Sequence, residues 1–186
     1  MMEQIIFGGT LMKKYINLWD YAGEILEQVG TAALVTTKAG AEVNTMTIGW
    51  GTLGVEWGKP LFTVFVRQSR HTKKLLDENG EFTINVHPKG VDRKKELAFC
   101  GRNSGRNVNK FKELALHLEE PDVISVPGIK ECPITLECRV VYKQDQDLRA
   151  LDADKCQRYY AKETPNDGDF HTAYYGEVLA AYIIED

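Results

Sequence analysis

The chain has 186 residues, 43% of them hydrophobic, and a formal net charge of −4. This length and composition predict one domain, residues 1–186, with a buried core. They exclude a membrane-spanning helix, because no run of about 18 uncharged apolar residues occurs. An acidic chain also argues against nucleic acid as a partner, since binding it normally needs an extended basic face.

Neither the N-terminus nor the cysteines indicate export, and we expect a soluble, cytoplasmic protein. The apolar run 5–12 precedes Lys13 and Lys14, the reverse of their order in a signal peptide. Residues 1–11 are expected to be disordered. The four cysteines form no CxxC pair and have no histidine at zinc-site spacing, which predicts reduced thiols: Cys100, Cys132, Cys138 and Cys156.

Short runs rich in apolar and β-branched residues predict strands. In chain order they cover 31–37, 43–50, 61–66, 81–86, 133–142 and 171–184. Helical patterns cover 19–29, 73–78, 91–116 with a break at 101–105, and 152–160. The glycine-rich stretch 51–58 is expected to be a loop, and Thr72 or Ser69 is expected to cap the second helix.

The strands mostly follow one another through turns, which favours antiparallel pairing. The predicted fold is therefore mainly β, an antiparallel β-barrel with helical insertions.

Two side chains have structural predictions of their own. Cys138 lies in an alternating run and should be a small core residue, and His87, beside a proline, should lie in a turn or at the surface.

Positive charge is concentrated in the middle of this acidic chain. The segment from Arg67 to Lys112 holds 12 Lys and Arg against 5 Asp and Glu. A confined basic region suits a small anion such as a phosphate, although charged residues also commonly solvate exposed helix faces. Only Cys100 in this segment has the cationic neighbours, Arg102 and Arg106, that a reactive thiolate needs.

Two turns in this segment have the composition of anion sites. The first, 67–72, joins a strand to a helix and combines Arg67 and Arg70 with the hydroxyls of Ser69 and Thr72. A helix N-terminus adds backbone N–H donors, but an ordinary capped helix with surface arginines explains the pattern equally well. The second turn, 101–110, offers Ser104, Gly105, Arg106 and Lys110 without Walker or GxGxxG spacing.

A third segment could hold a flat heterocycle. In the strand 44–50, polar side chains alternate with apolar ones and end at a Gly-Trp corner. Its polar groups could bond the edge of a ring while Trp50 or Met46 covers a face. An ordinary barrel strand would show the same alternation.

These segments occur in the order and at the spacings of a known family. They are 44–50, 59–72, 80–86, 104–111 and 171–178. The chain resembles the flavin-reductase-like family with the FMN-binding split-barrel fold, and within it the flavoredoxins. The resemblance, which covers residues 34–184, implies non-covalent FMN and a homodimer with the flavin near the subunit interface.

The resemblance also implies roles for individual residues. The flavin ring and ribityl chain would lie along Asn44, Thr45, Met46, Thr47, Ile48, Gly49 and Trp50. The phosphate would be bound by Ser69, Arg70 and Thr72, helped by Ser104, Arg106 and Lys110. His171 would approach the flavin from the last strand. No side chain is expected to act as a catalytic acid or base, and no metal is expected.

Three functions remain open at this stage. The first is a flavin reductase in which FMN takes a hydride from NADH or NADPH, with the flavin supplying the chemistry. The second is an electron carrier that exchanges electrons with a redox protein partner and does not use nicotinamide. The third is an anion-binding barrel with no redox role.

Overall fold

The computed structural model describes residues 12–31, 33–87, 89–161 and 168–185. The expected disorder of residues 1–11 concerns residues outside these ranges. The strands are β1 (Met12–Tyr15), β2 (Ala33–Ala39), β3 (Glu42–Ile48), β4 (Gly51–Glu56), β5 (Lys59–Arg67), β6 (Glu81–Val86), β7 (Leu118–Glu119), β8 (Gly128–Ile129), β9 (Ile134–Asp145) and β10 (His171–Glu185). The helices are α1 (Leu18–Val29), α2 (His71–Asn79), α3 (Lys94–Arg102), α4 (Lys110–Glu113), α5 (Ala153–Tyr160) and a short 3-10 turn (Leu148–Ala150).

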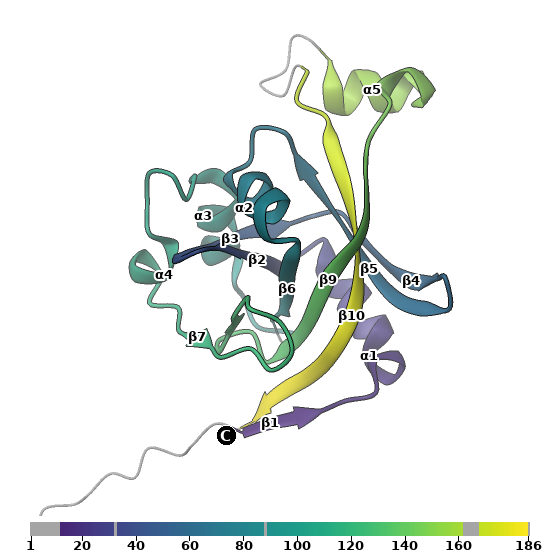
Figure 1. The fold of residues 1–186 in the computed structure, drawn as a ribbon. Coiled ribbons are helices and arrows are strands. Elements are labelled where there is room, and N and C mark those ends of the chain that lie inside the picture. The colour runs from purple at the N-terminus through teal and green to yellow at the C-terminus, as the bar shows by residue number, and fades with distance from the viewer. Residues whose placement is uncertain (1–11, 32, 88, 162–167, 186) are drawn as a thin grey trace, which may run out of the picture.

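An eight-stranded antiparallel sheet in the order β3-β2-β6-β9-β10-β5-β4, with β1 added to β10, forms the body of the fold. Figure 1 shows β2, β3 and β6 with α2, α3 and α4 on one side, and β4 and β5 on the other. The long strands β9 and β10 run through both parts. They therefore hold the two halves of the sheet together.

The last strand, β10, is long because it pairs with three others. Its first half pairs with β5, most of its length pairs with β9, and its end pairs with β1. Its register against β9 shifts between Tyr175 and Gly176 and again between Val178 and Ala180. Such irregularities bend a strand and increase its twist, which lets β10 curve across the whole sheet.

Two apolar clusters hold these elements in place. The larger lies within the sheet and under α1, and includes Ile25, Phe62, Phe82 and Leu136, all fully buried. The smaller lies under α3 and α4 and consists of Leu34, Leu97, Cys100, Leu116, Ile129 and Cys132. Each buried aliphatic or aromatic side chain contributes roughly 1.5–3 kcal/mol by leaving water. The smaller cluster fixes α3 against β2.

The predicted mainly β architecture is confirmed, since each predicted strand has a counterpart in β2, β3, β5, β6, β9 or β10. The helical predictions correspond to α1, α2, α3, α4 and α5. The break predicted at 101–105 begins later, after Arg102 at the end of α3, and extends to α4. Cys138 is fully buried, as predicted. Among the described residues, no helix is both long enough and apolar enough to span a membrane.

The prediction of a loop at 51–58 is wrong. Residues 51–56 form β4, which pairs with β5 in continuous register from Gly51 opposite Val64 to Glu56 opposite Lys59. Its hairpin turn is Trp57-Gly58, where both residues have positive φ. The glycines obscured the alternation of polar and apolar residues that would have indicated a strand. Gly51 is required by packing, because a Cβ at this position would lie 2.9 Å from Phe62 Cζ.

Two further local predictions are wrong. Thr72 does not cap α2, because the helix begins at His71 with Arg70 at the cap and no capping side-chain bond. Thr72 instead accepts a hydrogen bond from Asn44 of β3 (2.9 Å). His87 is fully buried, because α3 and the turn before β9 cover the end of β6. The residues next to His87 in the sequence do not indicate that these distant elements bury it.

We expect Gly176→Val to lower the free energy of unfolding by about 1–3 kcal/mol. A Cβ at Gly176 would meet Phe82 Cζ at 2.4 Å and Cys138 Cβ at 3.0 Å, inside the core between β6, β9 and β10. Urea unfolding measures the change. As a control, Gly23→Ala in α1 meets no atom within 4 Å and should raise stability by roughly 0.5–1 kcal/mol. A tolerated Gly176→Val would contradict this packing.

Candidate functional site

Two adjoining clefts lie where β3, the start of α2, the α3–α4 turn and the start of β10 meet. One, of about 90 Å³, is lined by Asn44, Met46, Ser69, Arg70, His71, Thr72, Cys100, Asn103, Ser104, Gly105, Arg106 and Lys110. The other, of about 170 Å³, is lined by Met46, Thr47, Ile48, Gly49, Trp50, Phe65, Arg67, Arg70 and His171. Met46 and Arg70 line both, so the two clefts form one candidate site.

Lys110 is the central charge of the smaller cleft. Its side chain is buried, and its Nζ donates to the backbone carbonyls of Thr45 (2.7 Å) and Cys100 (2.8 Å). Burial, together with the positive charge of Arg70, lowers the Lys110 pKa to about 8. Within the described residues Lys110 forms no ion pair with a carboxylate. A buried ammonium without a counter-charge favours an anionic ligand.

Two arginines lie beside Lys110 and are held by backbone oxygens. The Arg70 guanidinium donates to the carbonyl of Gly101 (3.1 Å), and the Arg106 guanidinium donates to the carbonyl of Ser69 (3.0 Å). These bonds join the start of α2 to the end of α3 and to the α3–α4 turn. Since α2 spans nine residues, its first turn adds the partial positive charge of a helix N-terminus.

Gly105 allows the α3–α4 turn to approach β3 closely. A Cβ on Gly105 would stand 2.1 Å from Asn44 Oδ1 and 3.1 Å from His71 Cδ2. Only glycine fits this position without moving those groups. The close approach brings the side chains of Ser104, Arg106 and Lys110 to the same cleft as Asn44.

Arg67 and Ser69 are engaged by the segment before β10. The Arg67 guanidinium donates to the carbonyls of Asp169 (2.7 Å) and Tyr159 (3.2 Å). The backbone N–H and the hydroxyl of Ser69 both donate to the Asp169 carboxylate, at 2.8 and 2.5 Å. Asp169 thus occupies two donors that were predicted to bind a phosphate.

An aromatic wall closes the larger cleft. The rings of Trp50 and His171 have centroids 4.6 Å apart, and Tyr159 packs edge-on against Trp50 at 5.1 Å. The Tyr160 hydroxyl donates to Gln146 Oε1 (2.7 Å) and lies 2.6 Å from His171 Nδ1. Because this hydroxyl has one proton, Nδ1–H of His171 donates to it and Nε2 is left as an acceptor.

Burial and the nearby charges of Arg67 and Arg70 lower the pKa of His171 to about 4. The imidazole is therefore neutral at pH 7. The positive charge in the larger cleft comes from the arginines.

Thr45 is the one predicted site residue that lines neither cleft. Its hydroxyl donates to the carbonyl of Val35 (3.1 Å) inside the sheet, so only its backbone oxygen reaches the site, through Lys110. The other fifteen predicted residues line one cleft or both. Sequence reasoning missed Phe65, His71, Cys100 and Asn103. His71 and Asn103 are next to predicted residues in the sequence, and this proximity was the available signal.

The environment of Cys100 does not favour the reactive thiolate that its cationic sequence neighbours left open. Its side chain is 1% exposed, and burial raises the pKa of its thiol to about 11. Its contribution to the site is its backbone carbonyl, which accepts from Lys110.

Comparison with known proteins identifies the fold family. The model of the flavin reductase like domain matches residues 29–186. The chain belongs to the flavin reductase-like family. An uncharacterized protein of Archaeoglobus fulgidus is 38% identical to this flavin reductase-like chain over 98 residues, 53% of this chain and 54% of that protein. The match thus spans about half the length of that relative.

Solved structures confirm the predicted split-barrel fold. Flavoredoxin from Methanosarcina acetivorans is 28% identical, with a TM-score of 0.60 over 82% of this chain and 67% of that chain. The FMN-binding domain of a flavin reductases-like enzyme from Shewanella baltica has a TM-score of 0.66 at 18% identity, over 95% of this chain and 79% of that chain. Its likeness supports the fold of this flavin reductase-like chain.

We expect His171 to titrate near pH 4 in the folded protein. Its folded pKa lies below the ordinary value of 6.5, so the unfolded chain binds this proton first as pH falls. The stability that the neutral imidazole contributes is complete above about pH 6.5 and declines from there to about pH 4. NMR of the His171 ring measures the midpoint, with His171→Gln assigning the signal. A midpoint at or above 6.5 would contradict the described environment.

Proposed function

We propose that this chain binds FMN non-covalently and is an oxidoreductase that uses it. The observation that carries the proposal is Lys110, a buried ammonium whose partners are two carbonyls, in a cleft that Arg70 and Arg106 also line. Three cationic side chains at one small cleft fit a phosphate dianion. Together with membership of the flavin reductase-like family, this fit favours a flavin phosphate over another small anion.

The phosphate would be held by Arg70, Ser104, Arg106 and Lys110, with the hydroxyl of Thr72 beside them. Ser69 would join only if Asp169 released its two donors. We therefore infer that the carboxylate of Asp169 competes with the phosphate for Ser69. Arg67 would act on the ligand through its charge, because carbonyls of α5 and of the segment before β10 accept its hydrogen bonds.

The flavin ring would lie in the larger cleft, along β3 and its Gly-Trp corner. Met46, Thr47, Ile48 and Gly49 line this cleft with Trp50 and His171. When bound, the flavin supplies the redox chemistry, taking a hydride from NADH or NADPH and passing electrons to an acceptor. The positive charges of Arg67 and Arg70 would stabilise a reduced, anionic ring. The neutral His171 would offer Nε2 as a hydrogen-bond acceptor.

A second candidate is an FMN-bearing electron carrier that takes electrons from a protein partner. The similarity to a flavoredoxin favours it. In either case a small-molecule or protein partner must reach the flavin. Trp50 is 37% exposed, so the edge of the larger cleft is accessible in the single chain.

The two candidates separate in an anaerobic experiment. FMN-loaded protein is mixed with NADPH and then with NADH while the flavin absorbance is followed. Rapid bleaching by either nucleotide establishes the reductase and names its donor. If the flavin stays oxidised until a chemical reductant or a reduced protein is added, the electron carrier is the function. Protein that remains colourless after incubation with FMN and desalting would overturn both.

We further propose that the protein is a homodimer. Val55 and Trp57 on the β4–β5 hairpin are 66% and 62% exposed, and Trp57 packs against the half-exposed Tyr142 of β9 at 6.2 Å. Large exposed apolar side chains in a cluster are typical of an interface. Sedimentation should give a dimer that Trp57→Ser weakens. A wild-type monomer would contradict the proposal.

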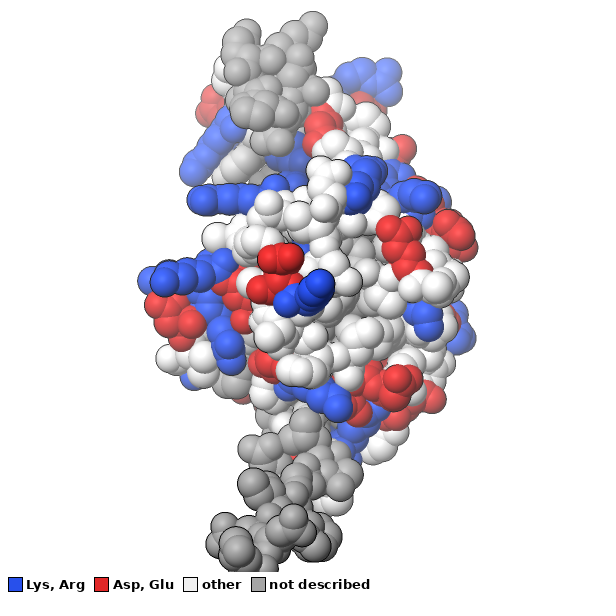
Figure 2. Space-filling model, turned by 90° about the vertical axis from the view of Figure 1, so that its left-hand side faces the viewer, with Lys and Arg blue, Asp and Glu red and all other residues white. Residues whose placement is uncertain are grey.

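Nucleic acid is not the expected ligand of the basic region. Figure 2 shows that the face on the left of Figure 1 mixes Lys and Arg with Asp and Glu, without one continuous basic surface. Such mixing favours a small anion over a polyanion.

We expect Lys110→Met to weaken FMN binding by about 10- to 100-fold, because a charge-assisted hydrogen bond to a phosphate contributes roughly 1.5–3 kcal/mol. Fluorescence titration of FMN gives the two dissociation constants. Lys112→Met is the matched control, since Lys112 is exposed and lines neither cleft. Equal affinities for wild type and Lys110→Met would show that Lys110 does not bind the phosphate.

A further inference from the structure

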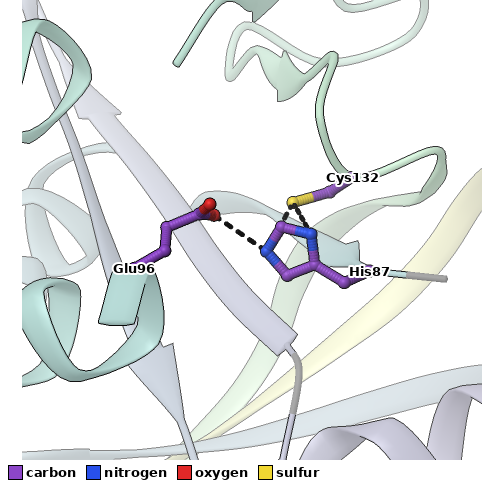
Figure 3. A group of neighbouring side chains, drawn as sticks. All are labelled: His87, Glu96 and Cys132. Atoms are coloured by element: carbon purple, nitrogen blue, oxygen red, sulfur yellow. Dashed lines mark hydrogen bonds and ion pairs between the residues drawn. The ribbon is translucent and has the colours of Figure 1, made fainter. Parts of the chain in front are cut away.

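A separate cluster of potential metal ligands lies behind α3. It consists of His87 at the end of β6, Glu96 on α3, and Cys132 in the turn before β9 (Figure 3). One ligand atom from each lies within 4.8 Å of the other two. His87 and Cys132 are fully buried, and the Glu96 side chain is 11% exposed.

The histidine is oriented as a metal ligand would be. Its Nδ1 lies 3.2 Å from the backbone carbonyl of Glu131, an acceptor that holds the proton on Nδ1. Nε2 is then left with its lone pair toward the cluster. Metal-binding histidines typically have this second hydrogen bond, which fixes the tautomer and the ring.

The other two groups converge on that nitrogen. Glu96 Oε1 lies 2.9 Å from His87 Nε2, and Cys132 Sγ lies 3.4 Å from Nε2 and 3.6 Å from Nδ1. Glu96 Oε1 is buried, and despite its short distance to His87 Nε2 it has no hydrogen bond of good geometry. Atoms that share one zinc ion lie about 3.3–3.6 Å apart when the bonds are about 2.0–2.3 Å long. To share an ion, Cys132 Sγ would turn from its place beside both ring nitrogens toward Nε2, and Glu96 Oε1 would move slightly away from it.

We propose that His87, Glu96 and Cys132 bind a divalent transition-metal ion of the zinc class. A thiolate and a carboxylate supply two negative charges, which neutralise the ion in a buried site. Nitrogen, sulfur and oxygen donors together suit zinc better than calcium or magnesium, which prefer oxygen alone. Three protein ligands leave a fourth position for water, on the partly exposed side of Glu96.

The ion would brace the wall of the candidate site. Three carbonyls of α3 accept bonds from site residues: Leu97 from Thr47, Cys100 from Lys110, and Gly101 from Arg70. The metal would tie this helix to the end of β6 and to the turn before β9. Its role is therefore structural, and it stands whether or not the chain binds FMN.

No motif indicates this site, because its ligands are far apart in the sequence. Eight residues separate His87 from Glu96, and thirty-five separate Glu96 from Cys132. The alternative is a metal-free cluster, in which His87 and Glu96 form a buried ion pair supported by Arg93 (3.4 Å from Glu96 Oε2) beside a neutral thiol.

The test uses full-length, tag-free protein stripped with a chelator and dialysed against Zn²⁺. Elemental analysis should give about one zinc per chain. Replacing zinc with Co²⁺ should produce a sulfur-to-cobalt charge-transfer band in the near ultraviolet, which a site without a thiolate cannot show. Zinc should also raise the melting temperature of the stripped protein.

Two near-isosteric variants and one control make the result specific. Glu96→Gln and Cys132→Ser should each weaken zinc binding by about 100-fold or more, and Cys132→Ser should abolish the cobalt band. Cys156→Ser removes a thiol outside the cluster and should change neither. Circular dichroism confirms that each variant is folded. Wild type that binds no zinc, or that binds it no better than folded Glu96→Gln, would overturn the proposal.

Discussion

The candidate site depends on one buried ammonium. Lys110 Nζ bonds a carbonyl of β3 and a carbonyl of α3, and so joins the sheet to the helical insertion. Burying this charge without a carboxylate is unfavourable, and the neighbouring Arg70 adds to the cost, as the lowered pKa of Lys110 indicates. An anion in the cleft would relieve this strain. The buried charge of Lys110 therefore lowers the stability of the folded chain but favours the binding of an anionic ligand. Such a conflict between stability and binding is typical of functional sites.

The surrounding fold makes that arrangement possible. The smaller apolar cluster presses α3 onto β2, and the close approach at Gly105 lets the following turn reach β3. The bent strand β10 brings His171 from the far end of the chain to the same place, beside Trp50. The cationic cleft and the aromatic cleft thus come from separate parts of the sequence and meet at Met46 and Arg70.

Sequence reasoning predicted the strands and most of the site because their signals are local. Runs of β-branched residues, basic turns and the Gly-Trp corner can each be recognised within a few consecutive residues of the sequence. It failed where the determinant was distant: β4 was hidden by its glycines, of which Gly51 packs against Phe62, and Asp169 takes the donors of Ser69 from a hundred residues away. His87 was misplaced for the same reason, since its cover comes from α3 and the turn before β9.

The central claim is that the cationic cleft recognises a phosphate attached to a flavin. Comparing the affinities of wild-type protein for FMN and for riboflavin tests it most directly, because the two ligands differ only in that phosphate. We expect FMN to bind at least about 100-fold more tightly than riboflavin, because riboflavin lacks the several charge-assisted hydrogen bonds that the phosphate accepts. Equal affinities would contradict it, because the cleft around Lys110 would then have no part in binding the flavin.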